Sequence, residues 1–234
     1  MARLLEQVDA AVVRERVAAA RAMIEEACAR SGRDPAAVEI LAATKYVPPE
    51  LMGALAQAGL KVVGENTAQA LIAKQERWGD AFTWDFIGHL QSRKTKQVLP
   101  RVRLIHSVES DSVVEQIQRH AEQPARVLLE VNVAGEESKY GVPLAEAGSF
   151  VERASQGEGV VFAGLMTMPP FAERPEDARG HFSRLRELAE RLRADWAPRH
   201  EFGTLSMGTS QDFEVAVEEG ATICRLGGVL YGSG

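Results

Sequence analysis

The chain has 234 residues, of which 45% are hydrophobic and 26% charged, and these proportions are typical of a globular protein with a sizeable core. The formal net charge of −6 argues against a nucleic-acid-binding surface, because affinity for a phosphate backbone comes mainly from clustered Lys and Arg. No segment is apolar for long enough to span a bilayer, and the amino terminus lacks the apolar stretch of a secretory signal. We therefore expect a cytoplasmic protein that binds neither nucleic acid nor a membrane.

Residues 1–32 predict one long amphipathic helix. Its apolar residues recur at alternating steps of four and three, with charges between them, at Val13, Val17, Ala20, Ile24 and Ala27. Ser31-Gly32 and Pro35 then end the pattern. We expect this helix to pack on the outside or on one end of a single domain that spans residues 1–234.

From residue 38 onward, short apolar runs alternate with helical periods. The predicted strands are 38–44, 60–64, 83–88, 103–107, 126–133, 160–166, 201–206 and 222–226. The predicted helices between them are 49–58, 67–76, 92–99, 111–122, 143–155, 176–196 and 211–219. This alternation predicts a parallel (β/α)₈ TIM barrel, and a doubly wound open sheet is the alternative.

The cysteines and histidines predict neither a disulfide framework nor a metal site. Cys28 lies in a helical pattern and Cys224 in a strand pattern, so both are expected to be reduced and structural. The five histidines are scattered, without carboxylate or cysteine partners at metal-binding spacings.

Lys45 closes the apolar run 38–44 and is soon followed by Pro48-Pro49, so its amine lies where a buried strand emerges from the core. Burial at such a position disfavours the charged form of lysine, lowers its pKa and frees the amine to attack a carbonyl carbon. A solvated lysine at the rim of the fold is the alternative.

Closure of the barrel would pair the first strand with the last and place Lys45 on the same rim as Arg225. Barrel active sites lie at the carboxyl ends of the strands, and phosphate commonly binds in the loops after strands seven and eight. Those loops read Ser206-Met207-Gly208-Thr209-Ser210 and Gly227-Gly228, with small residues and hydroxyls. They predict a site for an anionic group at this rim.

A lysine beside a phosphate site suits two chemistries, a Schiff base with pyridoxal phosphate or a Schiff base with a sugar-phosphate substrate, as in aldolases. Pyridoxal enzymes that need a strong electron sink place a carboxylate on the ring nitrogen, whereas an arginine such as Arg225 only donates a hydrogen bond there. A ring that faces Arg225 would be a weaker sink. An ordinary salt bridge is the alternative role for Arg225.

Several ordered motifs resemble the YggS/PROSC family of pyridoxal phosphate homeostasis proteins, whose fold is similar to the barrel domain of alanine racemase and binds the cofactor as a fold type III protein. The matching segments are Ala42-Ala43-Thr44-Lys45, Gly64-Glu65-Asn66, Phe86-Ile87-Gly88-His89-Leu90-Gln91-Ser92-Arg93-Lys94, His106-Ser107-Val108-Glu109-Ser110, Glu130-Val131-Asn132, Lys139-Tyr140-Gly141, Gly164-Leu165-Met166-Thr167-Met168, Leu205-Ser206-Met207-Gly208 and Arg225-Leu226-Gly227. Together they cover most of the chain from residue 42 onward.

The resemblance implies a role for each candidate residue. Lys45 would form the Schiff base with pyridoxal phosphate and Arg225 would face the pyridine nitrogen. The phosphate would be held by Ser206, Ser210, Gly227 and Gly228, and the cofactor pocket would be lined by Asn66 and His89. The chain departs from the family pattern at Gly228, where a hydroxyl residue is usual, and at Asp85, which replaces a common histidine and is not expected to touch the cofactor chemistry directly.

Some of these residues also have simpler interpretations. Asn66 would be a good cap for a helix that begins near Thr67. His89, at the end of an apolar strand, would be a satisfied core histidine. Tyr140 would pack a loop rather than act as a base.

We therefore expect a non-enzymatic protein of vitamin B6 homeostasis that sequesters pyridoxal phosphate or delivers it to apo-enzymes. The alternative is an amino-acid racemase of the alanine racemase type, which needs a second acid or base and a cover that excludes water. Only six residues follow Gly228, so we expect no second domain to supply them, although Tyr231 or a dimer partner could substitute. A Schiff-base aldolase is the third hypothesis. A monomer is the default expectation and a dimer the alternative.

Overall fold

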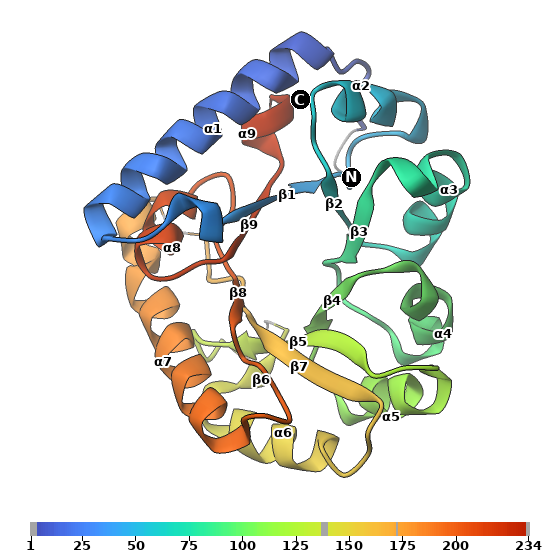
Figure 1. The fold of residues 1–234 in the computed structure, drawn as a ribbon, viewed down its shortest axis with the longest axis vertical. Coiled ribbons are helices and arrows are strands. Elements are labelled where there is room, and N and C mark those ends of the chain that lie inside the picture. The colour runs from blue at the N-terminus through green and yellow to red at the C-terminus, as the bar shows by residue number, and fades with distance from the viewer. Residues whose placement is uncertain (1–3, 137–139, 172, 233–234) are drawn as a thin grey trace.

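Eight parallel strands close into a barrel in the computed structural model, which describes residues 4–136, 140–171 and 173–232 (Figure 1). The barrel strands are β1 (Glu39–Ala43), β2 (Val62–Glu65), β3 (Thr83–Phe86), β4 (Leu104–Val108), β5 (Ala125–Asn132), β7 (Val160–Met166), β8 (Thr204–Ser206) and β9 (Ile223–Leu226). Pairing runs in this order, and β9 pairs with β1 to close the ring. The predicted TIM barrel is confirmed, and the closed pairing excludes the open sheet.

Helices surround the barrel and connect successive strands (Figure 1). They are α1 (Ala10–Ser31), α2 (Met52–Gln57), α3 (Ala68–Trp78), α4 (Thr95–Val98), α5 (Asp111–His120), α6 (Ala147–Ala154), α7 (Arg179–Trp196), α8 (Phe213–Glu218) and α9 (Gly228–Tyr231). Several begin later than the sequence predicts, because a 3₁₀ turn replaces the first helical turn, as at Pro49–Leu51 before α2. The strand β6 (Val142–Pro143) and helix α9 were not predicted, since neither is long enough to show a period.

Helix α1 packs outside the barrel against α8, α9 and α2 (Figure 1). It begins at Ala10 rather than at the start of the chain, because the Asp9 carboxylate accepts hydrogen bonds from the backbone N–H groups of Ala11 and Val12 and so caps the helix. It ends as predicted at Gly32, whose φ of 67° is the left-handed conformation that favours glycine.

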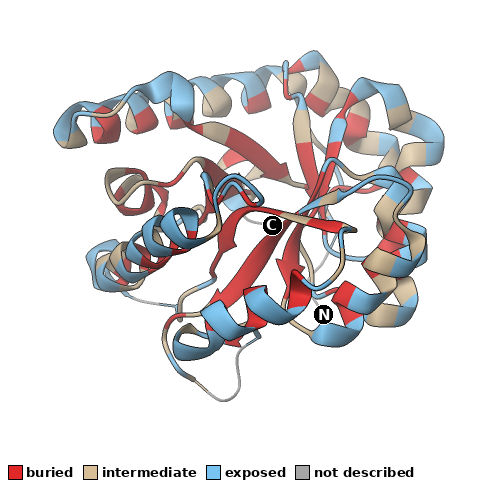
Figure 2. Ribbon diagram, turned by 60° about the horizontal axis from the view of Figure 1, so that its bottom comes forward, coloured by how far each residue is buried: buried red, intermediate tan, exposed pale blue. Residues whose placement is uncertain are grey.

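The strands separate two apolar clusters. Figure 2 shows strands that are buried along most of their length and helices that are buried on one side only. The larger, outer cluster fills the layer between strands and helices. The smaller, inner cluster lies inside the barrel and contains Leu41, Leu104, Leu128, Ala163, Met166 and Ile223. Side chains alternate along a strand, so Ile223 of the smaller cluster and Cys224 of the larger one point to opposite faces of β9. Arg225 shares the face of Ile223 and therefore points into the barrel.

Candidate functional site

The carboxyl ends of the barrel strands bring most of the predicted site residues to one rim. Lys45, Asn66 and His89 follow β1, β2 and β3, and Ser210 lies in the loop after β8. Ala42 of β1 is the register partner of Leu226 of β9, so Gly227-Gly228 leaves the barrel beside the segment that carries Lys45. The expected meeting of the first and last strands is therefore present. This rim is where active sites of such barrels lie.

Lys45 is exposed, and its amine lies 4.9 Å from the centroid of the Tyr46 ring. The premise that burial activates the Lys45 amine is therefore wrong for this structure. The solvated position leaves the amine open to a ligand that enters from the rim.

A buried ion pair supports the end of β1, next to the residue that precedes Lys45. The Lys74 ammonium on α3 contacts the Glu65 carboxylate and donates a hydrogen bond of 2.7 Å to the carbonyl of Thr44. The Thr44 hydroxyl donates to the same carboxylate. Since Thr44 precedes Lys45 and Glu65 precedes Asn66, this cluster ties together the two loops that carry these predicted site residues.

The last two loops of the barrel form a small oxygen-binding nest. The Ser210 hydroxyl oxygen accepts hydrogen bonds of 3.2 Å from the backbone N–H groups of Gly227 and Val229. Gly228 presents no side chain, and a Cβ built there would lie 3.9 Å from the Ser210 hydroxyl. The N–H groups at the start of α9 therefore converge on an oxygen atom, as a phosphate site at a barrel rim requires.

Arg225 is buried and bound inside the barrel. One terminal nitrogen donates to the carbonyl and hydroxyl oxygens of Ser206, at 2.8 and 2.6 Å, and the other donates to the carbonyl of Thr167 at 2.9 Å. Burial lowers the pKa of Arg225, and the nearby Glu130 carboxylate opposes that effect. The ordinary salt bridge considered for Arg225 is not formed with any carboxylate of the described residues.

Ser206 lies inside the barrel, where its hydroxyl bonds to Arg225 and, at 2.9 Å, to Nδ1 of His106. Nε2 of His106 lies 3.1 Å from the Asp85 carboxylate. A phosphate contact through the Ser206 side chain stays a prediction, while the loop after β8 reaches the rim through Ser210. Asp85, which was not expected to touch the cofactor chemistry directly, is connected to Arg225 indirectly, through these two residues.

His89 lies across the rim from the loop after β8. It is exposed and is not a core residue. Its Nδ1 lies 2.7 Å from the Glu109 carboxylate, which also accepts from the backbone N–H of Gly141. The His89 ring stacks on the exposed Tyr140 ring, with centroids 4.3 Å apart. Tyr140 thus packs against a candidate pocket residue, while its neighbour Lys139 lies outside the described residues.

Asn66 is exposed and does not cap α3. The Thr67 hydroxyl accepts from the backbone N–H of Ala70 and caps the helix instead. A Cβ on Gly88 would lie 2.1 Å from the Asn66 carbonyl oxygen, so only glycine lets the two loops approach this closely. Gly88 therefore holds Asn66 next to the loop that carries His89.

Glu130 is a buried carboxyl group on β5 that lies in a matching segment but was not among the predicted site residues. It lies two residues after Leu128 of the inner cluster, so it points into the barrel. Burial, and then the Glu109 carboxylate, raise its pKa to about 7, although Arg225 acts in the opposite direction. A raised pKa caused by burial beside a specific cation is a feature of functional sites.

Glu130→Gln is expected to flatten the dependence of stability on pH. The folded protein holds a proton on Glu130 up to about pH 7, whereas the unfolded chain releases it near the ordinary glutamate value. The free energy of unfolding of the wild type therefore falls as pH rises between these values, and the glutamine variant avoids a loss on the order of 2–3 kcal/mol at pH 8. Urea unfolding from pH 4 to 8 measures this difference. The exposed Glu158→Gln is the control, and parallel curves for the two variants would contradict the expectation.

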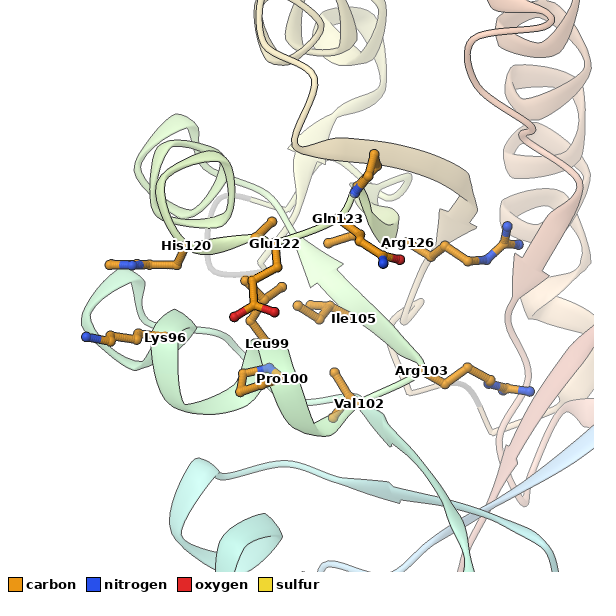
Figure 3. Close-up of a pocket in the computed structure, with 13 residues that line it drawn as sticks. Lys96, Leu99, Pro100, Val102, Arg103, Ile105, His120, Glu122, Gln123 and Arg126 are labelled. Atoms are coloured by element: carbon orange, nitrogen blue, oxygen red, sulfur yellow. The ribbon is translucent and has the colours of Figure 1, made fainter.

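A cavity of about 550 Å³ lies away from this rim, near the amino-terminal ends of β4 and β5 (Figure 3). Exposed Glu122 and Gln123 line it, and Figure 3 shows Arg103 and Arg126 extending away from its centre. Both arginines already pair with carboxylates, Arg103 with Glu39 and Asp85 and Arg126 with Glu201. Active sites of such barrels lie at the carboxyl ends of the strands, so we assign this cavity no catalytic or cofactor role.

Comparison with known proteins places the chain in a family. A family model described as alanine racemase, N-terminal domain, matches residues 22–234. A pyridoxal phosphate homeostasis protein of Aquifex aeolicus is 42% identical over 224 residues, which cover 93% of this chain and 96% of the relative. The chain belongs to the pyridoxal phosphate homeostasis protein family. A second member of this family, from Pseudomonas aeruginosa, is 38% identical over 94% of this chain and 95% of the relative.

A solved relative carries the cofactor. The structure of PipY of Synechococcus elongatus with pyridoxal phosphate bound is 30% identical, has a TM-score of 0.80, and covers 94% of this chain and 100% of that one. Alanine racemase of Corynebacterium glutamicum shares the fold at 13% identity and a TM-score of 0.73, over 63% of its own length. The resemblance inferred from the motifs is thus confirmed at the level of the family.

Other features bear on the remaining alternatives. Tyr231, considered as an acid or base for a racemase, has a buried hydroxyl without a hydrogen-bond partner in the described residues and packs against the outer cluster. Burial, then the Glu65 carboxylate, raise its pKa, which makes the phenol a poor proton donor or base.

No group of three or more potential metal ligands occurs in the described part of the chain. None of the described helices is long and apolar enough to cross a bilayer.

Proposed function

We propose that this protein binds pyridoxal phosphate in the cytoplasm, holds it through a covalent bond to the Lys45 amine, and stores or delivers it without sustained turnover. The names of its relatives and the cofactor-bound PipY structure support this function. The recipients we propose are apo-enzymes that require the cofactor, and the protein acts as a monomer.

The observation that carries the proposal is the Ser210 nest on the rim shared with Lys45. There, two backbone N–H groups already converge on an oxygen atom of the protein. An anionic phosphate presents several acceptor oxygens and suits such donors better than a neutral hydroxyl does. Lys45 supplies an accessible amine and Arg225 a buried donor. The residues present therefore fit the cofactor.

Arg225 sets the limits of the chemistry. When bound, pyridoxal phosphate supplies an aldehyde for the lysine and a ring that accepts electron density. The guanidinium only donates hydrogen bonds, so it holds a ring nitrogen without accepting its proton or giving one up. Three of its N–H groups bond to Ser206 and Thr167, and the fork carries five, so donors are left for a ligand within the described structure. This arrangement favours storage of the cofactor over a strong electron sink.

Trapping of the bound cofactor tests the proposal. The purified protein, given pyridoxal phosphate, is expected to turn yellow, to bleach with borohydride and to yield one labelled peptide that contains Lys45. A colourless protein that is labelled only in the presence of a sugar phosphate would instead support the aldolase. Sustained racemisation of L-alanine by the yellow protein would support the racemase.

A further inference from the structure

A chain of buried side chains crosses the inside of the barrel and ends on Arg225. It joins Asp85 of β3, His106 of β4, Ser206 of β8 and Arg225 of β9. The contacts are 3.1 Å from Asp85 to His106, 2.9 Å from His106 to Ser206, and 2.6 Å from Ser206 to Arg225. All four residues are buried. At its other end, Asp85 accepts from Arg103, which also pairs with Glu39 at the amino-terminal side of the barrel.

The chemistry of the four groups allows only one direction for the hydrogen bonds. Arg225 can only donate, so the Ser206 oxygen accepts from it, and the Asp85 carboxylate can only accept, so Nε2–H of His106 donates to it. In a neutral ring Nδ1 is then unprotonated and accepts the hydrogen bond from the Ser206 hydroxyl. Burial lowers the pKa of His106 and outweighs the opposing hydrogen bond to Asp85, which keeps the ring neutral. Burial acts to raise the pKa of Asp85, but the hydrogen bonds from His106 and Arg103 prevail and keep it lowered.

We propose that Asp85, His106 and Ser206 act as positioning residues that fix the Arg225 guanidinium for the ring nitrogen of bound pyridoxal phosphate. The inference rests on the proposed function. A guanidinium held on two sides, by Ser206 and by the Thr167 carbonyl, cannot turn toward other acceptors. Ser206 and His106 each donate one hydrogen bond and accept another within this chain, so loss of either residue leaves its neighbours with unpaired buried groups.

A second buried serine–histidine pair shows what a purely structural pair looks like in this protein. The Ser155 hydroxyl lies 2.7 Å from Nε2 of His200, and both residues are buried. Their other bonds go to the backbone, from Ser155 to the Val151 carbonyl and from the Phe162 N–H to His200. The chain through His106 differs because it ends on a charged side chain that has donors to spare. Ser155→Ala is therefore a matched control for Ser206→Ala.

The test compares cofactor binding in Ser206→Ala, Asp85→Asn and Ser155→Ala with the wild type. We expect Ser206→Ala to raise the Kd for pyridoxal phosphate about tenfold, since it removes a hydrogen bond to a charged group. We also expect it to shift the absorption band of the bound cofactor and the pH at which that band changes. Asp85→Asn should produce the same shifts to a smaller extent. Ser155→Ala should lose similar thermal stability while its Kd and spectrum stay at wild-type values.

Equal Kd values and equal spectra for Ser206→Ala and Ser155→Ala would overturn the inference. Failure of the proposed function looks different, because the wild type would then bind no cofactor at all. Nitrogen NMR of the histidine rings keeps the test decisive if a variant does not fold. In the wild type, His106 is expected to carry its proton on Nε2 from pH 6 to 8 and to respond when pyridoxal phosphate is added. A proton on Nδ1, or no response to the cofactor, would also refute the proposal.

Discussion

Lys74→Met is expected to lower the free energy of unfolding by about 3–5 kcal/mol, the usual cost of removing one partner from a buried ion pair. Lys74 and Glu65 are almost fully buried, with 4% and 0% of their side-chain surface exposed. Methionine fills a similar volume but leaves the Glu65 carboxylate without its cation in a site that water does not reach. Since the whole protein is stabilised by roughly 5–15 kcal/mol, this loss is a large part of the total.

Urea unfolding at pH 7 measures the effect, and thermal unfolding should show a fall of roughly 10 °C for a chain of this size. Lys61→Met is the matched control, because Lys61 is exposed and the same change there should have little effect. Glu65→Gln in the Lys74→Met background should restore part of the stability, since no buried charge is then left unpaired. A loss below about 1 kcal/mol in the single variant would mean that the Glu65 carboxylate does not depend on Lys74.

The fold was predictable because the alternation of strand and helix patterns extends over most of the chain. Apolar runs such as 126–133 and 160–166 are long enough to identify a buried parallel strand, and their observed ends differ by at most one residue. The closure of the barrel followed from the number of strands. The first residue of a helix was harder to predict than its existence. A capping residue such as Asp9 determines where the helix begins, and the period of the apolar residues does not show that position.

The residues at the rim of the site were also predictable, because the carboxyl ends of parallel strands lie at the same end of a barrel. The contacts between side chains inside the barrel were not predictable. Periodicity shows that a residue such as His106 or Glu130 lies in a strand, but a partner such as Ser206 is 100 residues from His106 and meets it only after the barrel closes. The same limit explains the error at Lys45. A run of apolar residues shows that β1 is buried, yet it does not show whether the next side chain turns toward solvent.

Two polar layers, an outer and an inner one, lie on opposite faces of the barrel sheet, and they have different roles. Thr44, Glu65 and Lys74 lie between strands and helices and hold the backbone on which Lys45 stands. Arg225 and Ser206 lie inside the barrel, where Ser206 bonds to the Arg225 guanidinium that would donate to the proposed ligand. Because the layers are on opposite faces of the sheet, a change in the outer layer is expected to alter mainly stability, whereas a change in the inner layer is expected to alter binding as well. This separation allows the two roles to be tested independently.

Lys45→Ala is expected to abolish covalent capture of pyridoxal phosphate completely and to leave the free energy of unfolding within about 1 kcal/mol of the wild type. The side chain is exposed and contacts the Tyr46 ring, an interaction worth about 0.5–1 kcal/mol at exposed sites. It belongs to neither polar layer, so its removal leaves no buried group unpaired. The loss of capture therefore reports on the amine itself and not on the fold.

Borohydride reduction followed by intact mass measurement counts the cofactor bound to each variant. Lys61→Ala should retain one label per chain, because that lysine lies before β2 and away from the rim. Lys45→Ala should take up none, yet it should still bind the cofactor reversibly and weakly, because the Ser210 nest lies in other loops and Arg225 lies in β9. One full label on Lys45→Ala would show that another amine captures the cofactor, and it would refute the assignment of Lys45 even if the rest of the site were correct.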